Sequence, residues 1–352
     1  MQSAFLLFIV LFIKSAIAVA SAAGESGAGF RLGVALYGSN GHQLRPDALE
    51  AHPNARLVGV AAVGDRFLPA GSTVRQYASL DEMLNDPEVQ LVSLCSPRRL
   101  DQARDAIRCL EAGKHVYAEK PSALTERDLD AIIDAAERSG RAFHEMAGTA
   151  FVQPYLEMRR LVAAGAVGEV VQVLVQKSYP YGASRPQDEA IDGGLMLQVG
   201  IHAIRMVEHV AGERVISIAG LETTVGNREP GAGRMAASLQ MRLENGGLAT
   251  IIANYLNPPH LQPRGHETLR IFGTDGFIES VDGGLRTRLV TQTEVLPLDT
   301  AAPSKNYFDL VAAHLVRGTP LPLSSEEELH PLRMLLRAKE ALSAKSSSVA
   351  PE

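Results

Sequence analysis

From residue 31 to about residue 145, short apolar runs of the β type alternate with helical apolar stripes. The runs are Leu32 to Tyr37, Leu57 to Val63, Leu91 to Cys95, Val116 to Ala118 and Ala142 to Glu145. Between the third and fourth runs, apolar residues recur at spacings of three and four from Leu100 to Leu110, and Gly113 follows as a C-terminal cap. Strands that alternate with helices need crossover connections, so this pattern predicts a parallel sheet in a Rossmann domain.

After about residue 146 the pattern changes to one helical stripe, Pro154 to Ala163, followed by long β-type segments. These are Glu169 to Lys177, Val215 to Thr224, Met235 to Leu243, Leu248 to Tyr255 and Thr268 to Phe272. The dipeptides Asn245-Gly246 and Asp275-Gly276 are typical of tight turns. The pattern predicts an α+β domain with a mostly antiparallel open sheet and helices on one face, closed by helices from Tyr307 to Val316 and from Glu326 to Leu342.

These patterns divide the 352 residues into four parts. Residues 24–145 are the predicted NAD(P)-binding Rossmann domain, residues 146–345 the α/β domain for substrate and oligomerisation, and residues 346–352 a tail. Residues 1–23 carry an apolar run, Ala4 to Ile13, that is too short to span a bilayer and has no basic residue before it. Either a signal peptide or a mis-called start explains this segment. We expect a cytoplasmic protein, with export through a signal peptide as the alternative.

Charge and composition bear on whether the protein binds nucleic acid, a membrane or a small molecule. The net charge is −6 and no basic block is present, so we expect no nucleic-acid partner, and no apolar run is long enough for stable membrane insertion. Cys95 and Cys109 lie in a strand-like run and on a helical stripe, where free cysteines are usually buried. The expected partner is therefore a small-molecule substrate.

The turn after the first strand, Gly38-Ser39-Asn40-Gly41, is the first candidate site. A dinucleotide pyrophosphate needs backbone N–H groups that bulky side chains do not cover. Asn40 replaces the second glycine of the G-x-G-x-x-G pattern, and asparagine tolerates a positive φ. A bulky residue at Gly38 is expected to block the cofactor while leaving the fold intact. A purely structural turn remains the alternative.

Asp65, at the end of the second strand, is the candidate partner of the adenosine ribose, and Arg66 directly follows it. A carboxylate there accepts from the ribose hydroxyls of NAD, whereas an arginine can pair with the 2′-phosphate of NADP. The sequence therefore predicts NAD or NADP without choosing between them, and a solvated loop pair remains the alternative.

The tripeptide Glu119-Lys120-Pro121 is the second candidate site, at the carboxyl end of a predicted parallel strand. Open α/β sheets bind their ligands at this edge, where Lys120 can bridge cofactor and substrate hydroxyl while Glu119 orients it. A lysine at a strand end is by itself also typical of a solvated surface charge.

With this tripeptide and a set of ordered motifs, the chain resembles the glucose-fructose oxidoreductase / inositol dehydrogenase (Gfo/Idh/MocA) superfamily. The motifs are Tyr77 to Leu84, Leu91 to Pro97, Leu110 to Val116, Gly165 to Val170, Gly200 to His202 and Gly273 to Gly276. The resemblance covers most of the chain after residue 31. It implies a nicotinamide domain followed by an α/β domain whose open sheet face forms homodimers or homotetramers.

The resemblance also implies hydride transfer at a carbinol carbon of a sugar, cyclitol or related polyol. Lys120 and His202 match the family's lysine and histidine for proton transfer, and Ser96 and Pro97 match the cofactor-contacting strand end. Four positions depart from the family pattern, namely Asp101, Phe151, Gln198 and Arg205. The last two stand where the family often has aspartates beside the histidine.

The segment from Leu195 to Val210 is apolar except for a stripe that contains Gln198, His202, Arg205, Glu208 and His209. Such a stripe lines a cleft, is internally paired, or forms a solvated helix face. We expect Gln198 to orient His202, and the charge of Arg205 to keep its imidazole neutral. No carboxylate or second histidine stands three or four residues from His202, so no metal site is expected.

The loop between the first long β-segment and this helix is the predicted substrate contact. Its polar residues suit a hydroxylated or carboxylated ligand, although an ordinary exposed loop remains the alternative. The candidate substrate-binding residues are Lys177, Tyr179, Arg185, Asp192, Gln198 and Arg205.

The sequence as a whole therefore predicts an NAD(P)-dependent oxidoreductase that acts on CH–OH groups. Two alternatives stay open: a lyase or glycosidase that uses bound NAD only transiently, and a dinucleotide-binding sensor without catalysis.

Overall fold

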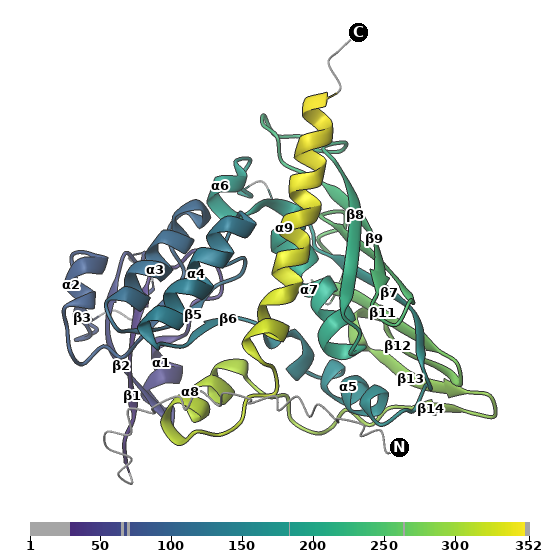
Figure 1. The fold of residues 1–352 in the computed structure, drawn as a ribbon, viewed down its shortest axis with the longest axis horizontal. Helices are drawn as coiled ribbons and strands as arrows, with labels where there is room; N and C mark the ends of the chain where they lie inside the picture. The colour runs from purple at the N-terminus through teal and green to yellow at the C-terminus, as the bar shows by residue number, and fades with distance from the viewer. Residues whose placement is uncertain (1–28, 65–66, 69–70, 183, 263–264, 349–352) are drawn as a thin grey trace, which may run out of the picture. The chain divides into compact units, whose positions relative to one another are not determined.

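The first part of the chain folds into a six-stranded sheet in which every neighbouring pair of strands is parallel (Figure 1). The computed structural model describes residues 29–64, 67–68, 71–182, 184–262 and 265–348. The strand order is β3-β2-β1-β4-β5-β6. The strands are β1 (Leu32–Tyr37), β2 (Ala55–Ala61), β3 (Arg75–Gln76), β4 (Leu91–Leu94), β5 (His115–Ala118) and β6 (Phe143–Glu145). The parallel sheet of a Rossmann domain is therefore confirmed.

Buried residues on both faces explain why these strands are continuous apolar runs rather than alternating ones. All four residues of β4 are buried, as are the first five of β1. The helices of this part are α1 (Pro46–Glu50), α2 (Leu80–Leu84), α3 (Gln102–Glu111) and α4 (Glu126–Ser139). Sequence periodicity predicted α3 with its cap at Gly113, which has a φ of 77°. It missed the two-residue β3, both of whose residues are exposed.

The second sheet has eight strands in the order β14-β13-β12-β11-β7-β10-β9-β8. All its pairs are antiparallel except the central pair of β7 and β10. The strands are β7 (Val170–Ser178), β8 (Val215–Thr223), β9 (Ala236–Leu243), β10 (Leu248–Asn254), β11 (His266–Gly273), β12 (Gly276–Val281), β13 (Arg286–Thr291) and β14 (Val295–Pro297). The mostly antiparallel sheet is confirmed, although the pattern did not predict the last three strands, because β13 is rich in charged residues and β14 is a short exposed edge.

Helices cover one face of this second sheet (Figure 1). The helices that contact its strands are α5 (Tyr155–Ala163), α7 (Ile201–Arg205) and α9 (Ser325–Ser348). Two more helices, α6 (Glu189–Asp192) and α8 (Tyr307–Arg317), contact the first part of the chain instead. Turns of π type, Met196–Gly200 and Met206–Val210, extend α7 at both ends and complete the predicted helix. In β9, buried and exposed residues alternate, as expected for a strand with one covered face. The opposite face leaves Leu174 and Ile252 exposed.

Helix α8 packs against the first sheet although it lies near the end of the chain. Phe308 is buried, and its ring lies 5.3 Å from that of Tyr117 in β5 and 5.4 Å from that of His52. The division of the chain at about residue 145 remains a prediction, and α8 returns across it.

The predictions for the two ends of the chain, residues 1–23 and the tail at 346–352, can be compared with the structure only in part. Residues 1–23 lie outside the described residues, and so do residues 349–352 of the predicted tail. Helix α9 continues to Ser348, past its predicted end at Leu342. Within the described part of the chain, no helix combines the length and the apolar character needed to cross a membrane.

Replacing Phe308 with alanine should lower the free energy of unfolding by about 3–5 kcal/mol, because it leaves a cavity between α8 and the first sheet. Denaturant titration followed by circular dichroism measures this change. The matched control is Val225→Ala, at a residue that is 80% exposed, which should change stability little. A loss below about 1 kcal/mol for Phe308→Ala would show that α8 does not stabilise the sheet.

Candidate functional site

A pocket of about 610 Å³ lies at the carboxyl end of β5 and contains both predicted catalytic residues. Lys120 reaches it from the loop after β5, and His202 reaches it from α7. Because the carboxyl ends of parallel strands are where such sheets bind ligands, this location agrees with a cofactor site. The other lining residues are His42, Leu44, Tyr117, Glu119, Met146, Gly148, Val152, Ser304, Lys305, Asn306 and Tyr307.

Lys120 is buried and is held by Gln198. Its Nζ donates to the backbone carbonyl of Gln198 at 2.9 Å and also contacts the side-chain Oε1 of that residue. Nζ lies 3.8 Å from Oε1 of Glu119. Burial lowers the pKa of Lys120 to about 8. The negative charge of Glu119 raises this pKa, and the positive charges of Arg99 and Arg205 lower it. The lysine is thus close to its titration point near neutral pH.

His202 is oriented by Thr149, not by Gln198 as predicted. The Nδ1 of His202 lies 3.2 Å from Oγ1 of Thr149, whereas the Gln198 amide oxygen accepts from Lys120. Burial lowers the pKa of His202 well below its ordinary value, and the charges of Lys120, Lys177 and Arg205 act in the same direction. The imidazole is therefore neutral at neutral pH. Sequence reasoning missed Thr149, because it lies in a short turn with no motif of its own.

Arg205 does not reach the pocket, which corrects its assignment as a substrate contact. It is fully buried, forms an ion pair with Glu145 and donates to the carbonyl of Met146 at 2.8 Å. Glu145 also accepts from the backbone N–H of Ser122 at 2.7 Å, directly after the Glu119-Lys120-Pro121 tripeptide. The ion pair therefore connects the helix of His202 to the loop of Lys120.

The remaining polar residues of the stripe, Glu208 and His209, have hydrogen-bond partners in α9, so the stripe is not a solvated helix face. Glu208 lies 2.8 Å from Nδ1 of His330, and Nε2 of His209 lies 2.7 Å from the carbonyl of Glu327. Both partners belong to α9. The stripe thus fixes the helix of His202 to the closing helix of the chain.

Lys177, at the end of β7, lies close enough to Lys120 for their charges to interact. Its ammonium forms an ion pair with Glu267, which accepts a hydrogen bond from the hydroxyl of Tyr155. It also lies 4.9 Å from the ring centroid of Tyr179. Burial and the charge of Lys120 lower the pKa of Lys177 to about 7. Sequence analysis missed Glu267 and Tyr155, since neither lies in a predicted site loop.

Arg185 and Asp192 are engaged with each other and with Tyr255. The Arg185 guanidinium lies 3.8 Å from the Tyr255 ring centroid, donates to its hydroxyl at 2.8 Å and approaches Asp192 to 3.6 Å. These side chains line a cavity of only about 10 Å³. Arg185 and Asp192 could contact a substrate, as predicted, only if these interactions were broken.

In the turn after β1, Gly38 and Gly41 stand where a side chain would clash with neighbouring atoms. Gly38 has a φ of 70°, and a Cβ there would lie 2.0 Å from the carbonyl oxygen of Cys95. A side chain at Gly38 would therefore disturb the sheet itself, which corrects the expectation that only cofactor binding would suffer. Gly41 has a φ of 119°, and its Cβ would lie 2.7 Å from the Glu119 carboxyl. Asn40 does not use its tolerance of a positive φ, because Gly38 and Gly41 take that conformation in the turn.

The remaining cofactor candidates surround this turn. Oγ of Ser39 accepts from the backbone N–H of Gly64 at 3.4 Å, and the carbonyl of Pro97 accepts from Asn40 at 3.2 Å. Ser96 is buried and donates to Asp105 at 2.9 Å. Asp65 and Arg66 lie outside the described residues.

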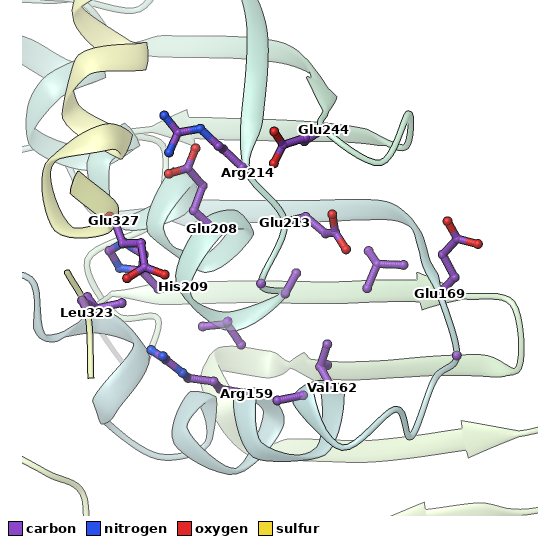
Figure 2. Close-up of a pocket in the computed structure, with 16 residues that line it drawn as sticks. Arg159, Val162, Glu169, Glu208, His209, Glu213, Arg214, Glu244, Leu323 and Glu327 are labelled. Carbon is purple, nitrogen blue, oxygen red and sulfur yellow. The ribbon is translucent and has the colours of Figure 1, made fainter. Parts of the chain in front are cut away.

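A second cavity of about 610 Å³ lies at the far end of the His202 helix, and Figure 2 shows its walls. Acidic side chains, among them Glu169, Glu213 and Glu244, stand around it together with Arg159 and Arg214. No predicted catalytic or cofactor residue lines it. In the part of the chain that the structure describes, no cluster of three or more His, Cys, Asp or Glu side chains could hold a metal ion. The Lys120 pocket is therefore the candidate active site.

Replacing Arg205 with methionine should destabilise the protein by about 3–5 kcal/mol, because it leaves the buried carboxylate of Glu145 without its cation. Thermal and denaturant unfolding measure the loss. Arg214→Met is the matched control, since it removes a largely exposed pair with Glu326 and should cost at most about 1 kcal/mol. Equal effects of the two substitutions would contradict a structural role for the buried pair.

Comparison with known proteins extends these observations. Residues 31–146 match the oxidoreductase family with the NAD-binding Rossmann fold, and residues 155–279 match the GFO/IDH/MocA C-terminal domain. An uncharacterized oxidoreductase of Rhizobium meliloti, ORF334, is 29% identical over 280 residues, which cover 74% of this chain and 80% of that protein. The scyllo-inositol 2-dehydrogenase (NADP(+)) of Bacillus subtilis is 23% identical over 339 residues, which cover 88% of this chain and 92% of the relative.

A solved structure supports the fold. The aldose-aldose oxidoreductase of Caulobacter crescentus superposes with a TM-score of 0.72 at 20% identity, covering 90% of this chain and 98% of that one. The matches confirm the predicted fold class, the oxidoreductase function and the nicotinamide cofactor. With family models matched in both of its parts, this chain belongs to the Gfo/Idh/MocA oxidoreductase family.

Proposed function

We propose that this oxidoreductase oxidises a hydroxyl-bearing carbon of a small polyol or sugar-like molecule, with Lys120 and His202 handling the hydroxyl proton. The observation that carries the proposal is their presence in one pocket, one residue from the edge of the parallel sheet and the other from the helix that packs on the second sheet. The scyllo-inositol dehydrogenase relative, whose name specifies a cyclic polyol, supports the substrate class.

The residues around the Gly38 turn fit a nicotinamide dinucleotide. In the described part of the chain, the backbone N–H groups of Ser39 and Gly41 have no hydrogen-bond partner, so both are available to a pyrophosphate. Glu119 and Lys120 follow β5, which lies beyond β4 from β1 and ends at the same edge of the sheet. When bound, the nicotinamide accepts the hydride from the substrate carbon. The choice between NAD and NADP rests on Asp65 and Arg66, which keep their proposed ribose role.

The neutral imidazole of His202 is the proposed proton acceptor. Thr149 holds Nδ1, which leaves Nε2 without a partner among the described residues and available to the substrate hydroxyl. The ammonium group of Lys120 would donate to the same oxygen and stabilise the negative charge that develops as the proton leaves. Acid-base help of this kind contributes roughly a hundredfold to ten-thousandfold in rate.

Lys177 is the proposed contact for a second polar group of the substrate. Its ion pair with Glu267 and the hydroxyl of Tyr155 place a cation, a carboxylate and a phenol together beside Lys120. Such a set can both donate to and accept from a further substrate hydroxyl. Tyr179, whose ring lies against Lys177, belongs to this wall of the proposed site.

The uncovered face of the second sheet is the proposed oligomer interface. Val171, Leu174 and Ile252 are 49%, 36% and 44% exposed there, on the strands at the centre of the sheet. A single open face of this kind is suited to a homodimer, in which the same patch meets itself, and a homotetramer would need a second contact.

His202→Ala and Lys120→Met should each lower kcat by at least about a hundredfold, because each removes a group that acts on the proton. Absorbance of the reduced nicotinamide, measured across a panel of polyols, sugars and hydroxy acids, identifies a substrate and gives the rates. The cofactor Kd of His202→Ala should stay close to the parental value. His260→Ala, at an exposed histidine, is the control. Parental kcat in both active-site variants would remove the assigned roles.

The pH dependence of kcat/KM should have two limbs. On the acid side it rises as His202 loses its proton, below pH 6.5 because its pKa is lowered. On the alkaline side it falls above about pH 8, as Lys120 loses its proton and can no longer donate. Gln198→Asp places a carboxylate beside Nζ of Lys120 and should move the alkaline limb upward by about one pH unit or more.

Lys120→Arg provides the control for this assignment, since a guanidinium keeps its charge and should abolish the alkaline limb. An alkaline limb that stays in place in both variants would show that another group titrates there.

Leu174→Glu combined with Ile252→Glu should convert the oligomer to monomers, because charges would be buried in the apolar interface. Size-exclusion chromatography with light scattering measures the mass. Leu285→Glu, at a residue 82% exposed on the loop before β13, is the control. A parental protein that is itself monomeric would refute the proposed interface.

A further inference from the structure

The pyrophosphate turn of this chain lacks two features that commonly shape such turns. In the G-x-G-x-x-G pattern, the second and third glycines allow close approach of backbone, ligand and helix. Counted from Gly38, those positions hold Asn40 and Gln43. The following helix, α1, begins only at Pro46, has five residues and has no side-chain cap. Its dipole can therefore contribute little to an anion bound at Gly38.

Gln43 uses its side chain to hold the first carbonyl of the turn. Its Nε2 lies 3.0 Å from the carbonyl oxygens of both Gly38 and Ser93. Its Oε1 accepts from Oγ of Ser93 at 2.5 Å and from the backbone N–H of Leu44 at 2.8 Å. The amide thus fills the place of the third glycine and fastens the turn to β4.

Arg99 holds the third carbonyl of the turn. Its guanidinium donates to the carbonyl oxygen of Asn40 at 2.7 Å and also contacts Oε1 of Gln102. The side chain is fully buried, and its Nε has no hydrogen-bond partner among the described residues. No carboxylate in the described part of the chain lies within 4.0 Å of it. A buried cation without a contact ion pair is costly, so its retention requires a compensating anion or a structural purpose.

The geometry of the peptide unit connects these two side chains to the ligand. In a trans peptide, the carbonyl of one residue and the N–H of the next point in opposite directions. The carbonyls of Gly38 and Asn40 are directed at the buried groups of Gln43 and Arg99. The N–H groups of Ser39 and Gly41 therefore point away from the protein interior, and neither has a partner among the described residues.

The charges next to the turn also favour an anion. Arg99 interacts electrostatically with Glu119, Asp192 and Glu145, which lie near Lys120, Arg185 and Arg205, respectively. This group contains four cations and three carboxylates, and all but Arg185 are buried. The excess positive charge lies behind the outward N–H groups, where a pyrophosphate would be stabilised.

We propose that Arg99 and Gln43 are positioning residues for the cofactor pyrophosphate. They fix two carbonyls so that the N–H groups of Ser39 and Gly41 face the ligand, and Arg99 supplies the positive potential that a long helix at the turn would otherwise provide. This inference rests on the dinucleotide site of the proposed function, and it concerns only how that site is shaped.

Calorimetric titration with NAD, ADP and adenosine tests the proposal, because only the first two contain a pyrophosphate. Arg99→Gln should weaken NAD and ADP at least about tenfold, as expected for losing a charge-assisted hydrogen bond, while adenosine affinity changes less than about twofold. Arg98→Gln, at the exposed neighbouring arginine, is the matched control and should leave all three unchanged. Gln43→Met should also weaken NAD and ADP more than adenosine.

Adenosine binding reports whether the domain remains folded. Should Arg99→Gln fail to fold, Arg99→Lys keeps the positive charge but loses the planar fork, and it should still weaken ADP more than adenosine. Equal loss of ADP and adenosine, or no loss of either, would overturn the positioning role while leaving the cofactor assignment intact. A parental protein that binds adenosine, ADP and NAD equally weakly would instead refute the dinucleotide site itself.

Discussion

The buried ion pair between Glu145 and Arg205 joins the two parts of the candidate active site. Glu145 ends β6 beside the loop of Lys120, and Arg205 lies on the helix of His202. The backbone N–H of Ser122 and the carbonyl of Met146 complete the hydrogen bonds of the pair. Because an unpaired charge at this depth would cost several kcal/mol, the ion pair stabilises the arrangement in which Lys120 and His202 share one pocket.

Burial then sets the chemistry that these residues can perform. It lowers the pKa of Lys120 to about 8 and keeps His202 neutral, with neighbouring cations acting in the same direction. Gln198, one of the positions that depart from the family pattern, gives Lys120 a hydrogen-bond acceptor without a negative charge. A carboxylate there would raise the pKa of the lysine, so the neutral amide helps to keep that pKa low.

At the turn of Gly38 and on the helix of His202, side chains stand in place of residues that the dinucleotide-binding and family patterns usually have there. At the proposed cofactor turn, Gln43 and Arg99 bind carbonyl groups next to positions where the dinucleotide-binding pattern has glycine. On the helix of His202, Arg205 departs from the family pattern and pairs with a carboxylate on β6. In each case the charge or hydrogen bond is supplied from a different element, so the backbone of the family fold is retained while individual partners change.

The sequence by itself determined the family, both sheets and the residues Lys120 and His202, because apolar periodicity and short ordered motifs are local properties of the chain. It did not predict β12, β13 and β14; β13 is rich in charged residues and β14 is a short exposed edge, so neither has a strong apolar pattern. Only the tertiary structure decided the partners: Thr149 for His202, Gln198 for Lys120, Glu267 for Lys177 and Glu145 for Arg205. Each of these pairs joins residues at least 53 positions apart in the sequence. Such contacts depend on how the elements pack rather than on spacing along the chain.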